Sequence, residues 1–176
     1  IEVYPLDENL DYAYYLMALC YYEQIIDEEK DLQSIKNAKQ NFNIVLNNYP
    51  ETEYAIDSSF KIDLINDILA SKEMYIGRYY FEKEKWIAAI NRFRTVIDEY
   101  ETTIYTQEAL HRLVEIYYTI GLKEESEKYA NLLGYNYQSS EWYKRSYSLF
   151  NIQYKQKRKE LVNKNKKGKK IIEKFT

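Results

Sequence analysis

Few side chains in this 176-residue sequence have the type and spacing that chemistry requires. His111 is the single histidine and Cys20 the single cysteine, and neither stands in an HExxH or CxxC motif of the kind that holds zinc. The sequence also contains no glycine-rich phosphate loop. We therefore expect no metal, no cofactor and no enzyme activity. Because Cys20 lies in an apolar helical run, we expect it to fill the core.

Two acidic pairs stand at helical spacing, Asp63 with Asp67 and Glu124 with Glu127. Residues three or four apart share one face of a helix. Carboxylates so placed can act as an acid and a base, but they more often form a solvated face. The candidate chemistry is therefore weak, and the helices that would position it are more informative.

Composition favours helices over strands. The sequence contains 4 Gly and 2 Pro, too few for a loop-rich or β-rich fold. It contains 21 Tyr against 6 Phe and 2 Trp. A Tyr hydroxyl needs a hydrogen-bond partner or water. This composition therefore suits thin layers of helices, in which the hydroxyls can reach solvent at the edge of the core. The sequence contains no run of 18 apolar residues, so it predicts no membrane-spanning helix.

The net charge of −3 conceals a division of charge along the chain. Residues 155–176 contain 10 Lys or Arg against 2 Asp or Glu, which gives +8. Residues 1–154 contain 15 against 26, which gives −11. A basic segment of this kind is typical of a solvated or an interacting tail. It could contact anionic lipid or nucleic acid, dock as a helix, or remain a disordered solubilising tail.

The stretch from residue 72 to 100 predicts two helices folded back on each other. Its first half contains Ile76, Gly77 and Tyr80, and its second half contains Ala89 and Phe93. Gly77 and Ala89 are small where two backbones approach, and the two rings fill the space beside them. With Ile in place of Leu, this order is the signature of the tetratricopeptide (TPR) repeat.

The same signature occurs earlier in the chain. Ala38, Phe42 and Pro50 reproduce its second half, including the proline that ends the repeat. Met17 and Ala18 occupy the places that Ile76 and Gly77 occupy later. We therefore predict an earlier hairpin with the same packing.

Repeat boundaries share the pattern Y-x-x-[ST]-x-aromatic, at offsets of 51 and 37 residues. The three segments are Tyr49–Tyr54, Tyr100–Tyr105 and Tyr137–Trp142. Their hydroxyl residues, Thr52, Thr103 and Ser140, are expected to cap the following helices. A TPR unit has about 34 residues, so we place the surplus of the first interval in a long segment, residues 55–80. This segment could form one helix or two with a break near Ser71, and Gly134 is expected to end a later helix.

These patterns predict an all-α fold, a right-handed TPR-like superhelix of antiparallel helix hairpins. Residues 1–154 would form about three units plus a terminal helix. Residues 155–176 would form the basic tail. A generic adaptor that binds an extended peptide in its concave groove would satisfy the same pattern.

Four segments carry a closer resemblance. They are DYAYYLMALCYYEQIID (11–27), LNNYPETEYAIDS (46–58), KEMYIGRYYFEKEKWIAAINRF (72–93) and LLGYNYQSSEWY (132–143). Over about residues 4–150 the sequence resembles the BamD family, the TPR lipoproteins of the machinery that inserts β-barrel proteins into the bacterial outer membrane. The resemblance covers the C-terminal three of about five repeats, and Cys20 does not match the lipidated cysteine.

The resemblance implies a non-enzymatic scaffold on the periplasmic face of the outer membrane. It implies binding to the periplasmic POTRA domains of the barrel subunit BamA and to other subunits of the complex. Unfolded outer-membrane protein substrates would bind the N-terminal half, and membrane attachment would come only from the N-terminal lipid anchor. In the periplasm no nucleic acid would be a partner.

The resemblance also directs attention to arginines in the AINRF segment. Arg92 belongs to this segment, and its planar group can hold a carboxylate through two hydrogen bonds. We expect Arg92 on the face of its helix away from the core, with a solvated role as the alternative. Arg78 and Arg94, on adjoining turns, are further candidates for the partner-binding surface.

Overall fold

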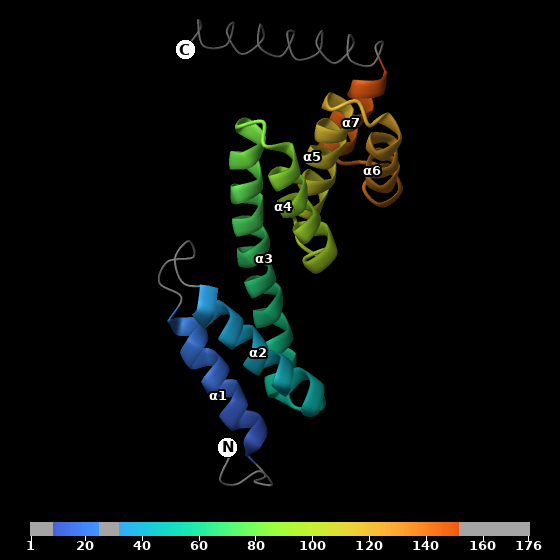
Figure 1. Cartoon of the computed structure of the whole chain (residues 1–176). Coiled ribbons are helices and arrows are strands. Elements are labelled where there is room, and N and C mark those ends of the chain that lie inside the picture. Colours follow the sequence, from blue (N-terminus) through green and yellow to red (C-terminus); the bar gives the residue numbers. More distant parts are fainter. Residues whose placement is uncertain (1–8, 25–31, 152–176) are drawn as a thin grey trace, which may run out of the picture. The chain divides into compact units, whose positions relative to one another are not determined.

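The computed structural model describes residues 9–24 and 32–151, and these residues form seven helices and no strand. The predicted all-α class is confirmed. The chain divides into two compact units, residues 1–106 and 107–176, which we describe separately (Figure 1). The predicted basic tail lies outside the described residues.

The first unit contains four helices, arranged along one long helix. The helices are α1 (Leu10–Glu23), α2 (Leu32–Asn48), α3 (Glu53–Glu82) and α4 (Trp86–Glu99). α1 packs on α2, and α2 and α4 pack on opposite halves of α3 (Figure 1). A hydrophobic core cluster joins α1, α2 and the part of α3 up to Leu69, and its buried members are Ala18, Ile35, Ala38, Phe42, Ile65 and Leu69.

α3 is one continuous helix of 30 residues, without a break near Ser71. Thr52 caps its start as predicted, because its Oγ1 accepts a hydrogen bond from the Ala55 amide at 3.3 Å. No proline interrupts the helix, and its buried face changes along its length. Up to Leu69 the buried residues are Ala55, Ser58, Ile65 and Leu69, and beyond it they are Ala70, Met74 and Gly77.

The closest approach of α3 and α4 lies at Gly77. A Cβ atom added at Gly77 would stand 2.6 Å from Phe93 Cε1 and 2.9 Å from Phe93 Cδ1. Phe93 and Ala89 are fully buried, and Tyr80 is half-buried. The ring of Phe93 therefore packs directly on the backbone of α3. In the first hairpin Phe42 is likewise fully buried.

The second unit contains α5 (Thr106–Thr119), α6 (Lys123–Asn136) and α7 (Glu141–Phe150). The rings of Tyr117 in α5 and Tyr129 in α6 stack with centroids 5.5 Å apart and an angle of 3°. The buried Ser126 hydroxyl donates to the Val114 carbonyl at 2.9 Å. Ser140 caps α7 as predicted, since its Oγ accepts from the Tyr143 amide at 3.1 Å.

Two expectations about this region were wrong. Gly134 does not end α6, which continues to Asn136. Instead Gly134 makes room for α7, because an added Cβ would lie 2.8 Å from Tyr143 Cε2. Thr103 does not cap α5, which begins at Thr106, and its hydroxyl donates to the Tyr100 carbonyl at 2.8 Å within the preceding turn.

The turns after α3 and α5 have the same geometry, 37 residues apart. In each, a residue with positive φ precedes an amide that donates back five residues along the chain. Gly121 (φ 86°) precedes the Leu122 amide, which donates to the Tyr117 carbonyl at 2.9 Å. Glu84 (φ 56°) precedes the Lys85 amide, which donates to the Tyr80 carbonyl at 2.9 Å. A residue with a Cβ thus occupies a conformation that favours glycine.

Gly77→Ala tests the close approach of α3 and α4. Alanine is the better helix former by roughly 0.5–1 kcal/mol, so the change should stabilise a helix without a nearby ring. We expect it to destabilise the protein instead, and Gly77→Leu to cost about 1–3 kcal/mol through overpacking. Urea denaturation followed by circular dichroism measures both. Tyr79→Leu, on an exposed site of the same helix, is the control, and a higher midpoint for Gly77→Ala would contradict the contact.

Glu84→Gly should stabilise the protein by about 1 kcal/mol, because a left-handed backbone costs residues with a Cβ about that much. Gly121→Ala is the reciprocal change at the equivalent turn and should destabilise by a similar amount. Thermal melts of both variants measure the effects. If Glu84→Gly lowered the melting temperature, the greater conformational entropy that glycine gives the unfolded chain would outweigh the relief of strain, and the account of this turn would be wrong.

Candidate partner-binding surface

Arg92 does not extend freely into solvent. It begins the last two turns of α4, and its Nη1 atom lies 3.0 Å from Oε2 and 3.3 Å from Oε1 of Glu73 on α3. The side chain of Arg92 is 43% exposed and that of Glu73 is 20% exposed. The pair therefore joins the two helices of the hairpin at a partly solvent-exposed position. An ion pair in such a position contributes little to the stability of the fold.

A shallow pocket of about 260 Å³ adjoins this pair. Its lining consists of Tyr80 from α3 and Ala88, Asn91, Arg92 and Thr95 from α4. The lining offers an aromatic ring, a small apolar wall, an amide and a guanidinium. Such a mixture suits contact with another protein better than a reaction, because it contains no carboxylate, thiol or imidazole.

Tyr100 and Lys39 extend the same region toward α2. The Lys39 ammonium lies 5.3 Å from the centroid of the Tyr100 ring. Burial, with the charges of Glu99 and Glu73 added, raises the pKa of Tyr100 to about 12. Burial also lowers the pKa of Lys39. The phenol therefore stays neutral at physiological pH, and Glu73 is close enough to influence both Tyr100 and Arg92.

The other two candidate arginines have different surroundings. Arg94 lies two residues after Arg92 on α4 and is exposed. Arg78 lies on α3, is half-buried and is engaged in an interaction within the protein. The pocket lining includes Arg92 but neither Arg78 nor Arg94.

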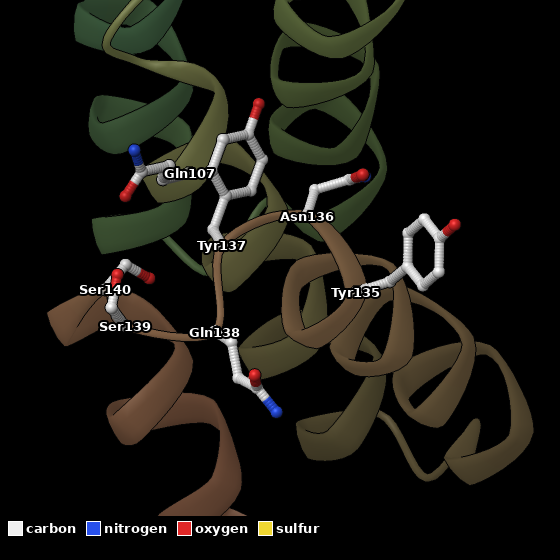
Figure 2. Close-up of a pocket in the computed structure, with 7 residues that line it drawn as sticks. All are labelled: Gln107, Tyr135, Asn136, Tyr137, Gln138, Ser139 and Ser140. Carbon is white, nitrogen blue, oxygen red and sulfur yellow. The ribbon is translucent and has the colours of Figure 1, made fainter.

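A second pocket, of about 580 Å³, belongs to the second unit. It is lined by Gln107 at the start of α5, by the last two residues of α6 (Tyr135 and Asn136), and by the segment that joins α6 to α7, residues 137–140. Tyr137 projects between Gln107 and Asn136, whereas Tyr135 points away from them (Figure 2). The lining has amide, hydroxyl and phenol groups without a charged group. It therefore presents no acid/base pair.

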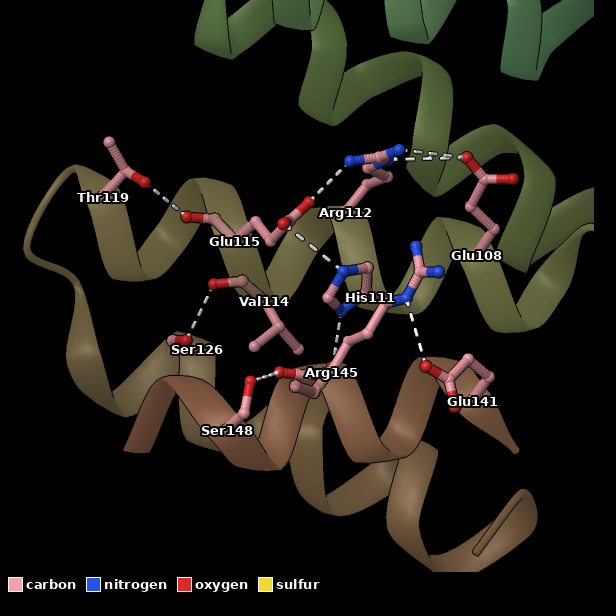
Figure 3. Close-up of polar contacts among 11 residues, drawn as sticks. Glu108, His111, Arg112, Val114, Glu115, Thr119, Ser126, Glu141, Arg145 and Ser148 are labelled. Carbon is pink, nitrogen blue, oxygen red and sulfur yellow. Dashed lines mark hydrogen bonds and ion pairs between the residues drawn. The ribbon is translucent and has the colours of Figure 1, made fainter. Parts of the chain in front are cut away.

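His111 takes part in a network of polar side-chain contacts that sequence spacing did not reveal. Its Nδ1 atom lies 2.8 Å from Ser146 Oγ of α7. Its Nε2 atom lies 3.3 Å from Glu115 Oε1, as Figure 3 shows. A serine, a histidine and a carboxylate in contact resemble a nucleophilic triad. Ser146 is fully buried and His111 is 2% exposed. The hydroxyl is thus out of reach of a substrate in this structure, and the contacts tie α5 to α7.

The rest of this network consists of ion pairs between side chains of α5. Arg112 contacts Glu115 at 2.8 Å and Glu108 at 3.4 Å. Despite its burial, the pKa of the Glu115 carboxyl is lowered by its hydrogen bond and charge interaction with His111 and by Arg112. The charged form of the Glu115 carboxyl is therefore stabilised by its neighbours, as expected of structural polar contacts.

Two further features bear on the sequence hypotheses. Cys20 is exposed on α1, so the expectation that it fills the core was wrong, and the buried small residue there is Ala18. Within residues 9–24 and 32–151, no three His, Cys, Asp or Glu side chains are grouped so that they could hold a metal ion. None of the described helices is long and apolar enough to cross a membrane.

Sequence reasoning proposed Arg92 but did not include Glu73, which forms an ion pair with it. The two residues are 19 positions apart on different helices, and no helical spacing rule connects such positions. The matching small and large residues of the hairpin could have indicated the pair. Gly77 contacts Phe93, which places the residues one turn before Gly77 and just before Phe93 near each other.

Comparison with known proteins identifies the family of this chain. The family model of YfiO, described as an outer membrane lipoprotein, matches residues 1–132. The outer membrane protein assembly factor BamD of Rickettsia prowazekii is 51% identical over 149 residues, which is 85% of this chain and 59% of that protein. BamD of Caulobacter vibrioides is 47% identical over 151 residues, which is 86% of this chain and 50% of that protein.

The chain thus spans little more than half the length of these relatives. Within the matched part, the resemblance predicted from the four sequence segments is confirmed. The chain belongs to the YfiO family of outer membrane lipoproteins.

Proposed function

We propose that this chain is part of a scaffold subunit in the assembly of outer-membrane β-barrel proteins, and that it binds the periplasmic POTRA domains of BamA. Relatives at 51% and 47% identity carry the name of an outer membrane protein assembly factor, which supports the assembly role. The Arg92–Glu73 pair beside the pocket of α3 and α4 supports the location of the binding surface.

The geometry of Arg92 suits recognition of a carboxylate. The bond to Glu73 uses Nη1, which leaves the Nε and Nη2 hydrogens directed elsewhere. A guanidinium has five such donors in a fixed plane and can hold a second carboxylate through two parallel bonds. Since Glu73 already restrains the side chain, less rotamer entropy is lost when a partner binds.

The role proposed here requires no catalytic group. The family description supports a location at the outer membrane, and we place the chain on its periplasmic face, held there by the lipid of the full-length lipoprotein. Other subunits of the assembly complex and unfolded outer-membrane proteins are further partners of the full-length protein in this proposal. A generic peptide adaptor would share the repeats, but the names of the relatives favour the assembly role.

Arg92→Glu tests the proposed surface. The variant should keep its helical circular dichroism but bind the BamA POTRA domains more weakly by roughly 2–5 kcal/mol, mainly because a partner carboxylate would be left facing a like charge. Isothermal titration of the POTRA domains with wild type and variant at equal ionic strength measures the loss. Equal affinities would remove Arg92 from the interface, and no binding by wild type would overturn the proposed function.

Two matched variants separate a contact from a general effect of charge. Arg94→Glu makes the same charge change at an exposed site on the same helix and should reduce affinity much less. Glu73→Gln breaks the internal ion pair but keeps the Arg92 guanidinium, so binding should largely persist. Equal losses for Arg92→Glu and Arg94→Glu would point to long-range electrostatics instead of a docked arginine.

A further inference from the structure

An apolar stripe lies on the first half of α3. Ile56, Phe60 and Leu64 follow one another at intervals of four residues and are 63%, 63% and 50% exposed. The buried residues of this half, including Ala55, Ser58 and Ile65, lie on other sides of the helix because each residue turns it by about 100°. Three large apolar side chains that follow one stripe form a continuous surface, unlike single exposed residues.

Acidic residues border the stripe on both sides. Glu53 precedes Ile56 by three residues, and Asp63 and Asp67 follow Phe60 and Leu64 by three. The other two charged residues between positions 53 and 67 face α1. The Tyr15 hydroxyl donates to Asp57 Oδ2 at 2.7 Å, and Lys61 Nζ lies 4.9 Å from the centroid of the Tyr22 ring. The border of the stripe is therefore negative.

The negative charge beside the stripe limits which kinds of molecule could bind to it. A second copy that packed stripe to stripe would bring like charges together, which is unfavourable at short distance. A membrane surface rich in anionic lipid would be repelled for the same reason. A partner with Lys or Arg beside its apolar side chains would meet opposite charges on both borders.

The length of the stripe indicates the form of the partner. From Ile56 to Leu64 the helix rises by about 12 Å, which is roughly two turns. Apolar anchors at positions i, i+4 and i+7 of a partner helix cover nearly the same distance, and such anchors are typical of helix recognition. We infer that the stripe of Ile56, Phe60 and Leu64 is a docking site for a basic amphipathic helix of another protein. It lies on the half of α3 that packs against α2, apart from Arg92.

The inference can be tested with a synthetic peptide of about 18 residues, long enough to form a helix. Leucines at i, i+4, i+7 and i+11 supply the anchors, and lysines flank them. Fluorescence anisotropy of the labelled peptide with the full chain should show saturable binding that weakens with salt. Phe60→Ala and the double variant Asp63→Lys with Asp67→Lys should each reduce affinity by about tenfold or more, which corresponds to about 1.4 kcal/mol.

Two controls guard against unspecific attraction between a basic peptide and an acidic protein. Glu124→Lys with Glu127→Lys changes the charge equally on α6, and Ile87→Ala removes an apolar side chain that is 78% exposed on α4. Both should leave affinity unchanged, and a peptide with Glu in place of Lys should not bind. Equal losses in the control variants, equal binding of the Glu peptide, or absence of binding to wild type would overturn the inference. Self-association abolished by Phe60→Ala would assign the stripe to a second copy and would also overturn it.

Discussion

The contact between the Phe93 ring and the backbone of α3 at Gly77 determines much of the first unit. No side chain larger than hydrogen fits between them, since an added Cβ would stand 2.6 Å from the ring. Because α4 must pack there, the second half of α3 cannot bury the face that its first half buries against α2. The long helix therefore packs against α2 with one side of its first half and against α4 with another side of its second half. The small and large residues of the repeat signature decide where these two helices lie.

The candidate binding surface follows from the same contact. Glu73 stands one turn before Gly77, and Arg92 stands just before Phe93. When the ring meets the glycine, the carboxylate and the guanidinium come to 3.0 Å of each other at the edge of the hairpin. Repeat packing and the position of the proposed arginine are therefore linked. The contact of Gly77 with Phe93 therefore also sets the geometry of the surface that we propose for a partner.

What the sequence predicted correctly depends on local interactions. The hairpin and the caps at Thr52 and Ser140 follow from patterns within a few residues. The wrong predictions concern choices made by packing. Gly134 resembles a helix end but instead makes room for the Tyr143 ring, and Cys20 lies in an apolar run yet faces outward. The Arg92–Glu73 and His111–Ser146 contacts join separate helices, so no spacing within one helix could reveal them.

A helix of 30 residues that buries different faces in its two halves leaves part of its circumference uncovered in each. In most monomeric proteins such a surface is polar, because an apolar one favours association. On α3 the uncovered part of the first half instead contains Ile56, Phe60 and Leu64 with an acidic border, and the hairpin formed by the second half holds an arginine at its edge. A surface that combines apolar contact with charge favours specific partners. Apolar contact alone would be unselective, and exposed charge alone would bind weakly. One continuous helix thus carries the proposed docking stripe in its first half and contributes Glu73 to the proposed arginine surface in its second half.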